Sequence, residues 1–225
     1  MVYKGINKIN QIMLKNKKIA KAYLGNKLVY TSSILPSEYQ QVEYIEGTGT
    51  QYINTGIKAN GLTTNYETEF MPTSIKNGVQ YIFSAKQARQ IKRFDSGWND
   101  DKGMWIAYNS GEVTKVTIEV KKAYNLKKNG DKIYFDNNLI ATIATLADFE
   151  TPVNIVLFAN NTNGTINYQA HLRLYYFKLY NGNDLIRDFI PCYRKTDNVI
   201  GLYDIVNNVF YTNAGTGTFI KGSDV

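Results

Sequence analysis

The sequence predicts an all-β protein in which two antiparallel sheets pack face to face as a sandwich. Its 225 residues include 18 Tyr and 10 Phe but only 4 Pro, a composition that favours strands and turns over disorder. Short runs of β-branched and aromatic residues recur along the chain, separated by turn-forming residues. No dedicated helix is evident. A chain of this length accommodates one sandwich and a small additional segment.

The additional segment lies at the N-terminus and is strongly basic. Residues 1–32 hold seven Lys and no acidic residue, whereas the remainder holds 19 basic and 19 acidic residues. Strand-like runs at 12–14, 19–24 and 28–30 predict a β-hairpin unit that is too small to fold alone. We therefore expect residues 1–33 to form an attachment segment and residues 34–225 to form the sandwich, with Pro36 near the boundary.

Three interpretations of the basic segment are open. Its lysines can form a solvated face that protects strand edges, a docking arm for an acidic protein surface, or a nucleic-acid contact. Nucleic acid is disfavoured because the segment has no Arg and few stacking side chains. For docking on a partner, the candidate residues are Lys15, Lys17, Lys18, Lys21 and Tyr23.

The sandwich domain carries regularly spaced strand patterns. We expect strands, in chain order, at residues 40–45, 51–53, 65–70, 80–85, 104–108, 115–120, 123–127, 131–135, 139–143, 154–158 and 170–179. Asn129-Gly130, Asn181-Gly182 and Asp136-Asn137-Asn138 predict hairpin turns. Strict alternation in the last strand would place Leu172, Leu174, Tyr176 and Lys178 on one face and Arg173, Tyr175, Phe177 and Leu179 on the other.

Two glycine- and aromatic-bearing segments near opposite ends of the chain are the most informative feature. They are residues 35–57 (LPSEYQQVEYIEGTGTQYINTGI) and 201–222 (GLYDIVNNVFYTNAGTGTFIKG). We expect their Gly-Thr-Gly-Thr turns to meet, with the last strand returning near the first. Both segments resemble the ends of concanavalin A-like, laminin G-like jelly-roll modules found in bacteriophage structural proteins and bacterial surface proteins. The resemblance spans about residues 35–222 and implies a binding module.

Enzymatic motifs are weak. The Gly47-x-Gly49 turn lacks the Lys and the following helix of a phosphate-binding loop. Some concanavalin A-like proteins are glycan hydrolases, but Glu67 and Glu69 do not match the carboxylate pattern that such enzymes use. We expect His171 to be a hydrogen-bonded structural residue and Cys192 to be a small buried hydrophobe.

The resemblance also raises the question of calcium, which related modules bind at the sandwich rim. The candidate ligands are Asp95, Asp100, Asp101 and Asp204, because calcium takes six to eight oxygen ligands from loops. The alternative, that these residues simply form turns, is favoured. No other cofactor is expected.

We expect ligand recognition in the loops between Lys86 and Asn109. The candidate ligand-binding residues there are Phe94, Trp98, Arg93, Asn99 and Asp100, a mixture of aromatic and polar groups that suits a sugar or a protein. Trp98, between a Gly and an Asn, is expected to be exposed. Trp105, in an alternating run, is expected to lie in the core.

The resemblance implies a bacteriophage virion protein of a fibre, tail or capsid decoration, and the weak enzymatic motifs predict that it is not an enzyme. Its sandwich would adhere to a host-surface glycan or protein, and its N-terminal segment would dock on other virion proteins. The alternatives are a purely structural cementing protein and, with less support, a glycan hydrolase. By resemblance we expect a homo-oligomer, with a trimer favoured, made in the host cytoplasm, without nucleic-acid binding or membrane insertion.

Overall fold

The computed structural model describes residues 34–75 and 78–225, and the backbone of short strands before residue 34. Those short strands are β1 (Tyr3–Lys4), β2 (Asn7–Lys8), β3 (Met13–Leu14), β4 (Lys17–Lys18), β5 (Lys21–Leu24) and β6 (Lys27–Thr31). β5 and β6 pair as an antiparallel hairpin, as predicted for this segment. The candidate docking side chains, those of Lys15, Lys17, Lys18, Lys21 and Tyr23, lie outside the described residues.

The larger of two main sheets contains eleven strands in the described part of the chain. Its main path runs β17-β16-β15-β10-β21-β22-β23-β24, while β7 pairs with β22, β8 pairs with β21, and β25 pairs with β8. The bounds are β7 (Tyr39–Gln41), β8 (Ile45–Thr48), β10 (Thr64–Pro72), β15 (Tyr124–Asn129), β16 (Lys132–Phe135), β17 (Asn138–Thr142), β21 (His171–Asn181), β22 (Asp184–Arg194), β23 (Ile200–Asp204), β24 (Val209–Thr212) and β25 (Ile220–Lys221).

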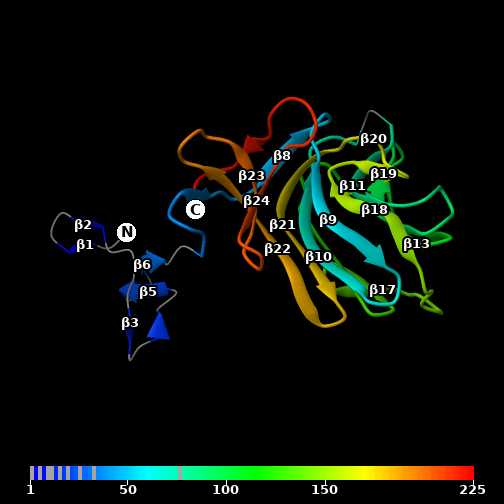
Figure 1. The fold of residues 1–225 in the computed structure, drawn as a ribbon, viewed down its shortest axis with the longest axis horizontal. Helices are drawn as coiled ribbons and strands as arrows, with labels where there is room; N and C mark the ends of the chain where they lie inside the picture. The colour runs from blue at the N-terminus through cyan, green and yellow to red at the C-terminus, as the bar shows by residue number, and fades with distance from the viewer. Residues whose placement is uncertain are drawn as a thin grey trace.

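The second sheet has six strands in the order β14-β13-β12-β11-β18-β9 within the same described ranges. They are β9 (Ile53–Asn60), β11 (Gln80–Ala85), β12 (Arg93–Trp98), β13 (Gly103–Asn109), β14 (Gly111–Thr117) and β18 (Glu150–Leu157). A small separate hairpin, β19 (Asn160–Thr162) and β20 (Thr165–Asn167), follows β18. Figure 1 shows the strands stacked in layers, with no helix between them.

The core lies between the two sheets and is dominated by aromatic side chains. Tyr66 of β10 contacts Phe83 of β11 with ring centroids 4.7 Å apart, and Phe70 stacks on Trp98 of β12 at 6.3 Å. These rings are almost completely buried. Side chains from both inner faces therefore interlock, as in other sandwiches. The predicted all-β jelly-roll sandwich is confirmed.

The two glycine-rich end segments meet, as predicted. The Thr216 amide donates to the Thr50 carbonyl (3.1 Å), and the Tyr52 amide donates to Oδ1 of Asn213 (3.1 Å). Nearby, β25 pairs with β8. The chain is thus closed by contacts between segments about 160 residues apart.

The turn predictions are also confirmed. Gly130 and Gly182 both have φ of 60°, and they join β15 to β16 and β21 to β22. Asp136 and Asn137, also at positive φ, close the β16–β17 hairpin. Asn, Asp and Gly tolerate this conformation better than other residues.

The strict alternation expected for β21 is wrong. The register shifts opposite Glu69 and Phe70, which is a bulge between β10 and β21. Because a bulge inserts one extra residue, the side-chain pattern changes phase there. Leu172 and Leu174 before it, and Phe177 and Leu179 after it, all face the core.

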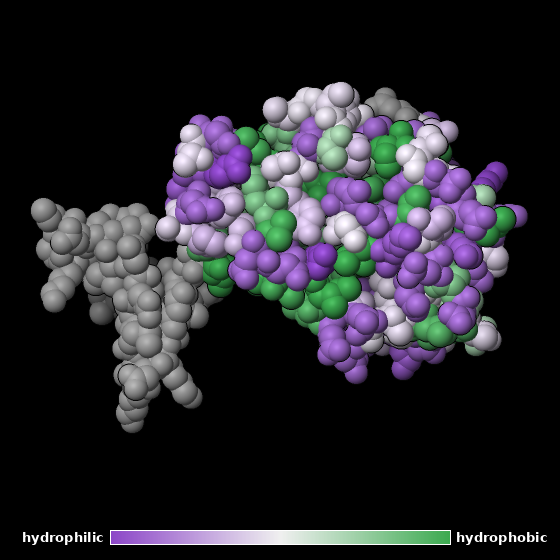
Figure 2. Space-filling model, viewed as in Figure 1, coloured by the Kyte–Doolittle hydropathy of each residue, from purple (hydrophilic) through white to green (hydrophobic). Residues whose placement is uncertain are grey.

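The surface of the sandwich is mixed in character. Figure 2 shows mainly hydrophilic residues on the visible face, with hydrophobic residues in separate patches. Leu139 and Tyr168 are examples of exposed apolar side chains, each 53 % exposed. Among the described residues, no helix is long and apolar enough to span a membrane.

Candidate functional site

A hollow of about 680 Å³ lies on the outer face of the six-stranded sheet, the face turned away from the core. We call it the outer-face pocket. Its floor comes from β11, β12 and β13, and its sides come from β14, the β19–β20 hairpin and the segment after β11.

Strand alternation on β12 creates the floor. Phe94 and Trp98 belong to the core cluster, whereas Arg93 and Asp95 face the pocket side. Gly97 lies under the Trp105 ring, and a Cβ atom there would come within 2.8 Å of that ring and would collide with the Gln80 carbonyl oxygen. Glycine is required here because only a residue without a side chain lets the ring lie against the sheet.

Asp95 is the centre of a buried polar network. Its two carboxylate oxygens accept hydrogen bonds from Nη2 and Nε of Arg93, both at 2.9 Å, in a fork-like pair. Oδ1 also accepts a hydrogen bond from Nε1 of Trp105 at 2.9 Å. Burial lowers the pKa of Arg93, but the hydrogen bond and charge of Asp95 outweigh it and raise the pKa. The network fixes both the guanidinium and the indole.

Lys86 is a second buried cation in the floor. Its Nζ donates to the Tyr81 hydroxyl at 2.8 Å and lies 3.7 Å from Oδ2 of Asp95. Burial lowers the pKa of Lys86, and Asp95 opposes that shift. The same burial, with the nearby Asp95 charge, raises the pKa of Tyr81.

Aromatic rings line the pocket. Tyr81 and Trp105 meet edge to face with centroids 5.3 Å apart, and the Tyr168 ring lies 6.3 Å from Tyr81. Tyr168 is half exposed and has a φ of 53°. This left-handed conformation is unfavourable for a bulky residue, and such strain concentrates at functional sites.

The β19–β20 hairpin is attached firmly to the floor as one wall. The Lys86 amide donates to the Asn161 carbonyl (3.0 Å), and Ser84 Oγ donates to Oδ1 of Asn160 (3.0 Å). Nδ2 of Asn160 also donates to Oδ1 of Asn167 at 2.8 Å. Asn99 also lines the pocket, and its buried Oδ1 has no hydrogen-bond partner in the described part of the chain.

The structure separates the predicted ligand-binding residues. Arg93 and Asn99 line the outer-face pocket. Phe94 and Trp98 are 1 % and 0 % exposed and lie in the core, so the expected exposure of Trp98 is wrong. Asp100 is outside the pocket lining, exposed, and accepts a hydrogen bond from the Gly78 amide at 2.8 Å.

Trp105 is buried, as predicted, but it lies with Tyr81 and Ala107 in a small cluster on the pocket side of the sheet and not in the cluster between the sheets. Residues 93–98 form β12 and not part of the predicted loop set, which is why the expected exposure of Trp98 is wrong. The sequence does contain a signal for the inward position of Trp98, which is the pair Arg93 and Asp95. Their two-residue spacing on a strand puts both charges on one face, and Trp98 then lies on the other. Tyr81 and Tyr168 were missed because residues distant in sequence meet here.

The calcium candidates do not gather in space. Asp95 is engaged by Arg93 and Trp105, and buried Asp204 accepts hydrogen bonds from backbone amides such as that of Asp188. Asp101 accepts from the Gly103 amide in a turn. Across the described ranges, no three His, Cys, Asp or Glu side chains are placed to hold a metal ion.

The remaining residues considered as catalytic candidates, two glutamates, one histidine and one cysteine, lie outside the outer-face pocket. Glu67 pairs with Lys127 at 3.4 Å, and burial raises the pKa of Glu69. Nδ1 of His171 is buried and has no partner among the described residues, contrary to the expected hydrogen bond. Cys192 is fully buried, as predicted, and burial raises its thiol pKa to about 12.

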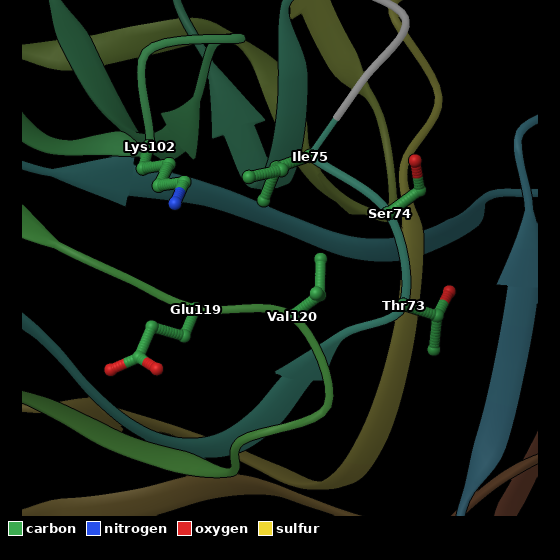
Figure 3. A pocket seen from close by; sticks show the side chains of 6 residues that line it. All are labelled: Thr73, Ser74, Ile75, Lys102, Glu119 and Val120. Carbon is green, nitrogen blue, oxygen red and sulfur yellow. The ribbon is translucent and has the colours of Figure 1, made fainter.

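A second hollow lies between the ends of other strands. Figure 3 shows Ile75 and Val120 facing each other across it, with Lys102 and Glu119 at its edges. Its described lining includes no aromatic side chain and no buried charge network, so it offers fewer groups for specific recognition than the outer-face pocket.

No protein-family model and no curated protein matches the chain. Among solved structures, the CBM40 of Ruminococcus gnavus IT-sialidase is similar, with 18 % identity, a TM-score of 0.42, and coverage of 66 % of this chain and 92 % of that one. A mutant of Trypanosoma rangeli sialidase displaying trans-sialidase activity has 12 % identity and a TM-score of 0.42, and the alignment covers 54 % of this chain but 21 % of the sialidase. These similarities identify no ligand for this chain.

Proposed function

We propose that this protein is a non-enzymatic binding module that recognises a carbohydrate in its outer-face pocket. The observation that carries the proposal is the combination of Tyr81, Trp105 and Tyr168 with buried polar side chains around one hollow. Aromatic rings present flat apolar surfaces to the C–H faces of a sugar, and fixed polar groups bind its hydroxyls. A concave site with aromatic walls and a few oriented polar groups is typical of small-ligand recognition.

The test is binding of the purified protein to intact bacterial cells and to their isolated surface polysaccharide. We expect saturable binding that is lost in Trp105→Ala. Trp98→Phe is the matched control, since it changes a tryptophan of the same sheet on the opposite face. Equal binding by both variants and the parent would refute the pocket as the receptor site.

We further propose that the protein acts as a homo-oligomeric virion component of a bacteriophage, with the sandwich displayed towards the host and residues 1–33 docked on virion proteins. This proposal rests on the resemblance of the two end segments to modules of phage structural proteins. Weak affinity per site would suffice, because many copies on one particle add avidity. Immunogold labelling of purified particles, with and without deletion of residues 1–33, tests the location.

A further inference from the structure

The floor of the outer-face pocket holds an unequal number of buried charges. Lys86 and Arg93 are 4 % and 6 % exposed, and Asp95 is the only acidic side chain of the described residues that lies within 4.0 Å of either charge. Arg93 takes both carboxylate oxygens of Asp95 at 2.9 Å. Lys86 Nζ is left at 3.7 Å from the same carboxylate, beyond hydrogen-bond distance.

Lys86 therefore keeps unused hydrogen-bonding capacity. An ammonium group has three N–H donors, and one of them is taken by the Tyr81 hydroxyl at 2.8 Å. A buried cation is costly unless a counter-charge and further acceptors compensate for its lost hydration. Asp95 compensates for one of the two cations, so the floor carries an excess positive charge.

The rim adds to this excess. Lys115 pairs with Glu112 at 3.4 Å, whereas Arg89 has no ion pair with any described residue. The pocket lining contains four basic side chains and one acidic side chain, and the buried carboxylate of Asp95 beneath it brings the formal charge to +2. After the Arg93–Asp95 and Lys115–Glu112 pairs are set aside, the unmatched cations are Lys86 in the floor and Arg89 at the rim.

The pocket also lacks a free carboxylate for a cationic ligand. The Asp95 oxygens are occupied by Arg93 and Trp105, and Glu112 is paired. By contrast, the unpartnered Oδ1 of Asn99 can accept a hydrogen bond from a hydroxyl. The groups of the pocket that are still available for a ligand are thus the N–H donors of Lys86 and Arg89, which suit an anion, and the Asn99 acceptor, which suits a hydroxyl.

From this we infer that the outer-face pocket selects an acidic glycan, in which a carboxylate or sulfate group of the sugar pairs with Lys86 and Arg89. The inference rests on the proposed carbohydrate-binding function and names its ligand class. The aromatic rings would contact the sugar ring, and the anionic group would supply the charge that the floor lacks.

The experiment compares matched neutral and acidic oligosaccharides by isothermal titration calorimetry at 50 mM and 300 mM salt. The pairs are oligogalactose against oligogalacturonate, for the carboxylate, and neutral against sulfated galactan fragments, for the sulfate. The variants are Arg89→Gln, which changes an exposed rim residue, and Lys86→Met. Lys132→Gln, an exposed lysine on β16 outside the pocket, is the control. Thermal unfolding of each variant establishes that it is folded.

The expected result is at least tenfold tighter binding of one acidic member than of its neutral partner, weakened at 300 mM salt. Arg89→Gln should reduce that preference severalfold, and Lys132→Gln should leave it unchanged. Equal binding of neutral and acidic partners would overturn the inference while supporting carbohydrate recognition. Preference for acidic sugars that survives in both pocket variants would also overturn it. Absence of binding by all oligosaccharides and by cell-surface polysaccharide would instead refute the proposed function.

Discussion

The two faces of the six-stranded sheet each bury a tryptophan, and they use it differently. Trp98 on the inner face is 0 % exposed, stacks on Phe70, and has an Nε1 without a hydrogen-bond partner in the described structure. Trp105 on the outer face is 7 % exposed, and its Nε1 donates to Asp95. Burial alone therefore does not distinguish a core tryptophan from one at the site. The two differ in whether the indole N–H has a polar partner, which Trp105 has in Asp95 and Trp98 lacks in the described structure.

Two buried lysines repeat the contrast. Lys128 of β15 lies on the inner side near Tyr108, and its Nζ donates to the Thr64 carbonyl at 3.0 Å and approaches Asn65 Oδ1 at 3.3 Å. Lys86 on the outer face lies near the carboxylate of Asp95. The inner lysine is thus held by neutral acceptors, whereas the outer lysine belongs to a network of charges.

The largest effect is expected from Trp98→Ala. Loss of a fully buried aromatic side chain leaves a cavity between the sheets and should lower the free energy of unfolding by about 3–5 kcal/mol. For a domain of this size, this corresponds to a decrease in Tm of roughly 6–20 °C. Urea unfolding followed by fluorescence measures it. A loss below about 1 kcal/mol would contradict the assignment of Trp98 to the core.

A smaller loss is expected from Asp95→Asn. Removal of the carboxylate leaves Arg93 and Lys86 buried without a counter-charge, which should cost about 3 kcal/mol. Asp148→Asn, at an exposed position, is the matched control and should change stability by less than about 0.5 kcal/mol. If both substitutions have the same small effect, the network does not stabilise the outer face.

The next prediction concerns pH and Lys128. Burial lowers the pKa of Lys128 to about 8. Between this value and the ordinary lysine pKa the unfolded chain binds more protons, so the free energy of unfolding rises with pH. This group should contribute a rise of about 1–2 kcal/mol from pH 8 to 9.5. Urea unfolding of the parent and Lys128→Met across this range measures the rise.

The difference between the two curves isolates Lys128 from the other groups. Tyrosines with raised pKa values, such as Tyr66 and Tyr176, and Cys192 act in the opposite direction at high pH. They are present in both proteins and cancel in the difference. Parallel curves for the parent and Lys128→Met would show that the buried amine does not titrate in this range.

Much of the fold could be predicted from the sequence because its signals are local. Residues 80–85 have the strand pattern that β11 realises, and Gly130 and Gly182 form the turns that their Asn-Gly pairs predict. The contact between the two glycine-rich ends could be predicted because each end carries the same turn chemistry. The bulge in β21 could not, since it depends on its pairing with β10.

The site was predicted only in part, for a physical reason. Arg93 and Asn99 were included, but Tyr81 and Tyr168 come from elements distant in sequence and are brought together by sheet pairing and the β19–β20 hairpin. The wrong expectation for Trp98 followed from missing β12, whereas Trp105 is buried as predicted but on the outer face of β13. A strand with charges on one face and aromatics on the other is buried on both sides, so hydrophobicity alone does not identify its inner face.

The smallest effect on stability is expected from Tyr168→Asn. This substitution relieves the backbone strain of Tyr168 and removes its ring contact, so it tests which of the two matters for the outer face. Asn adopts a positive φ more readily than Tyr, so relief of backbone strain offsets loss of the contact with Tyr81. Stability should stay within about 1 kcal/mol of the parent, whereas carbohydrate binding should fall severalfold because the exposed ring is gone. Tyr134→Asn on β16, outside the pocket, is the control for binding. A variant that is destabilised by more than about 2 kcal/mol and still binds normally would show that Tyr168 is kept for packing, and the strained tyrosine would then no longer distinguish the outer face from the core.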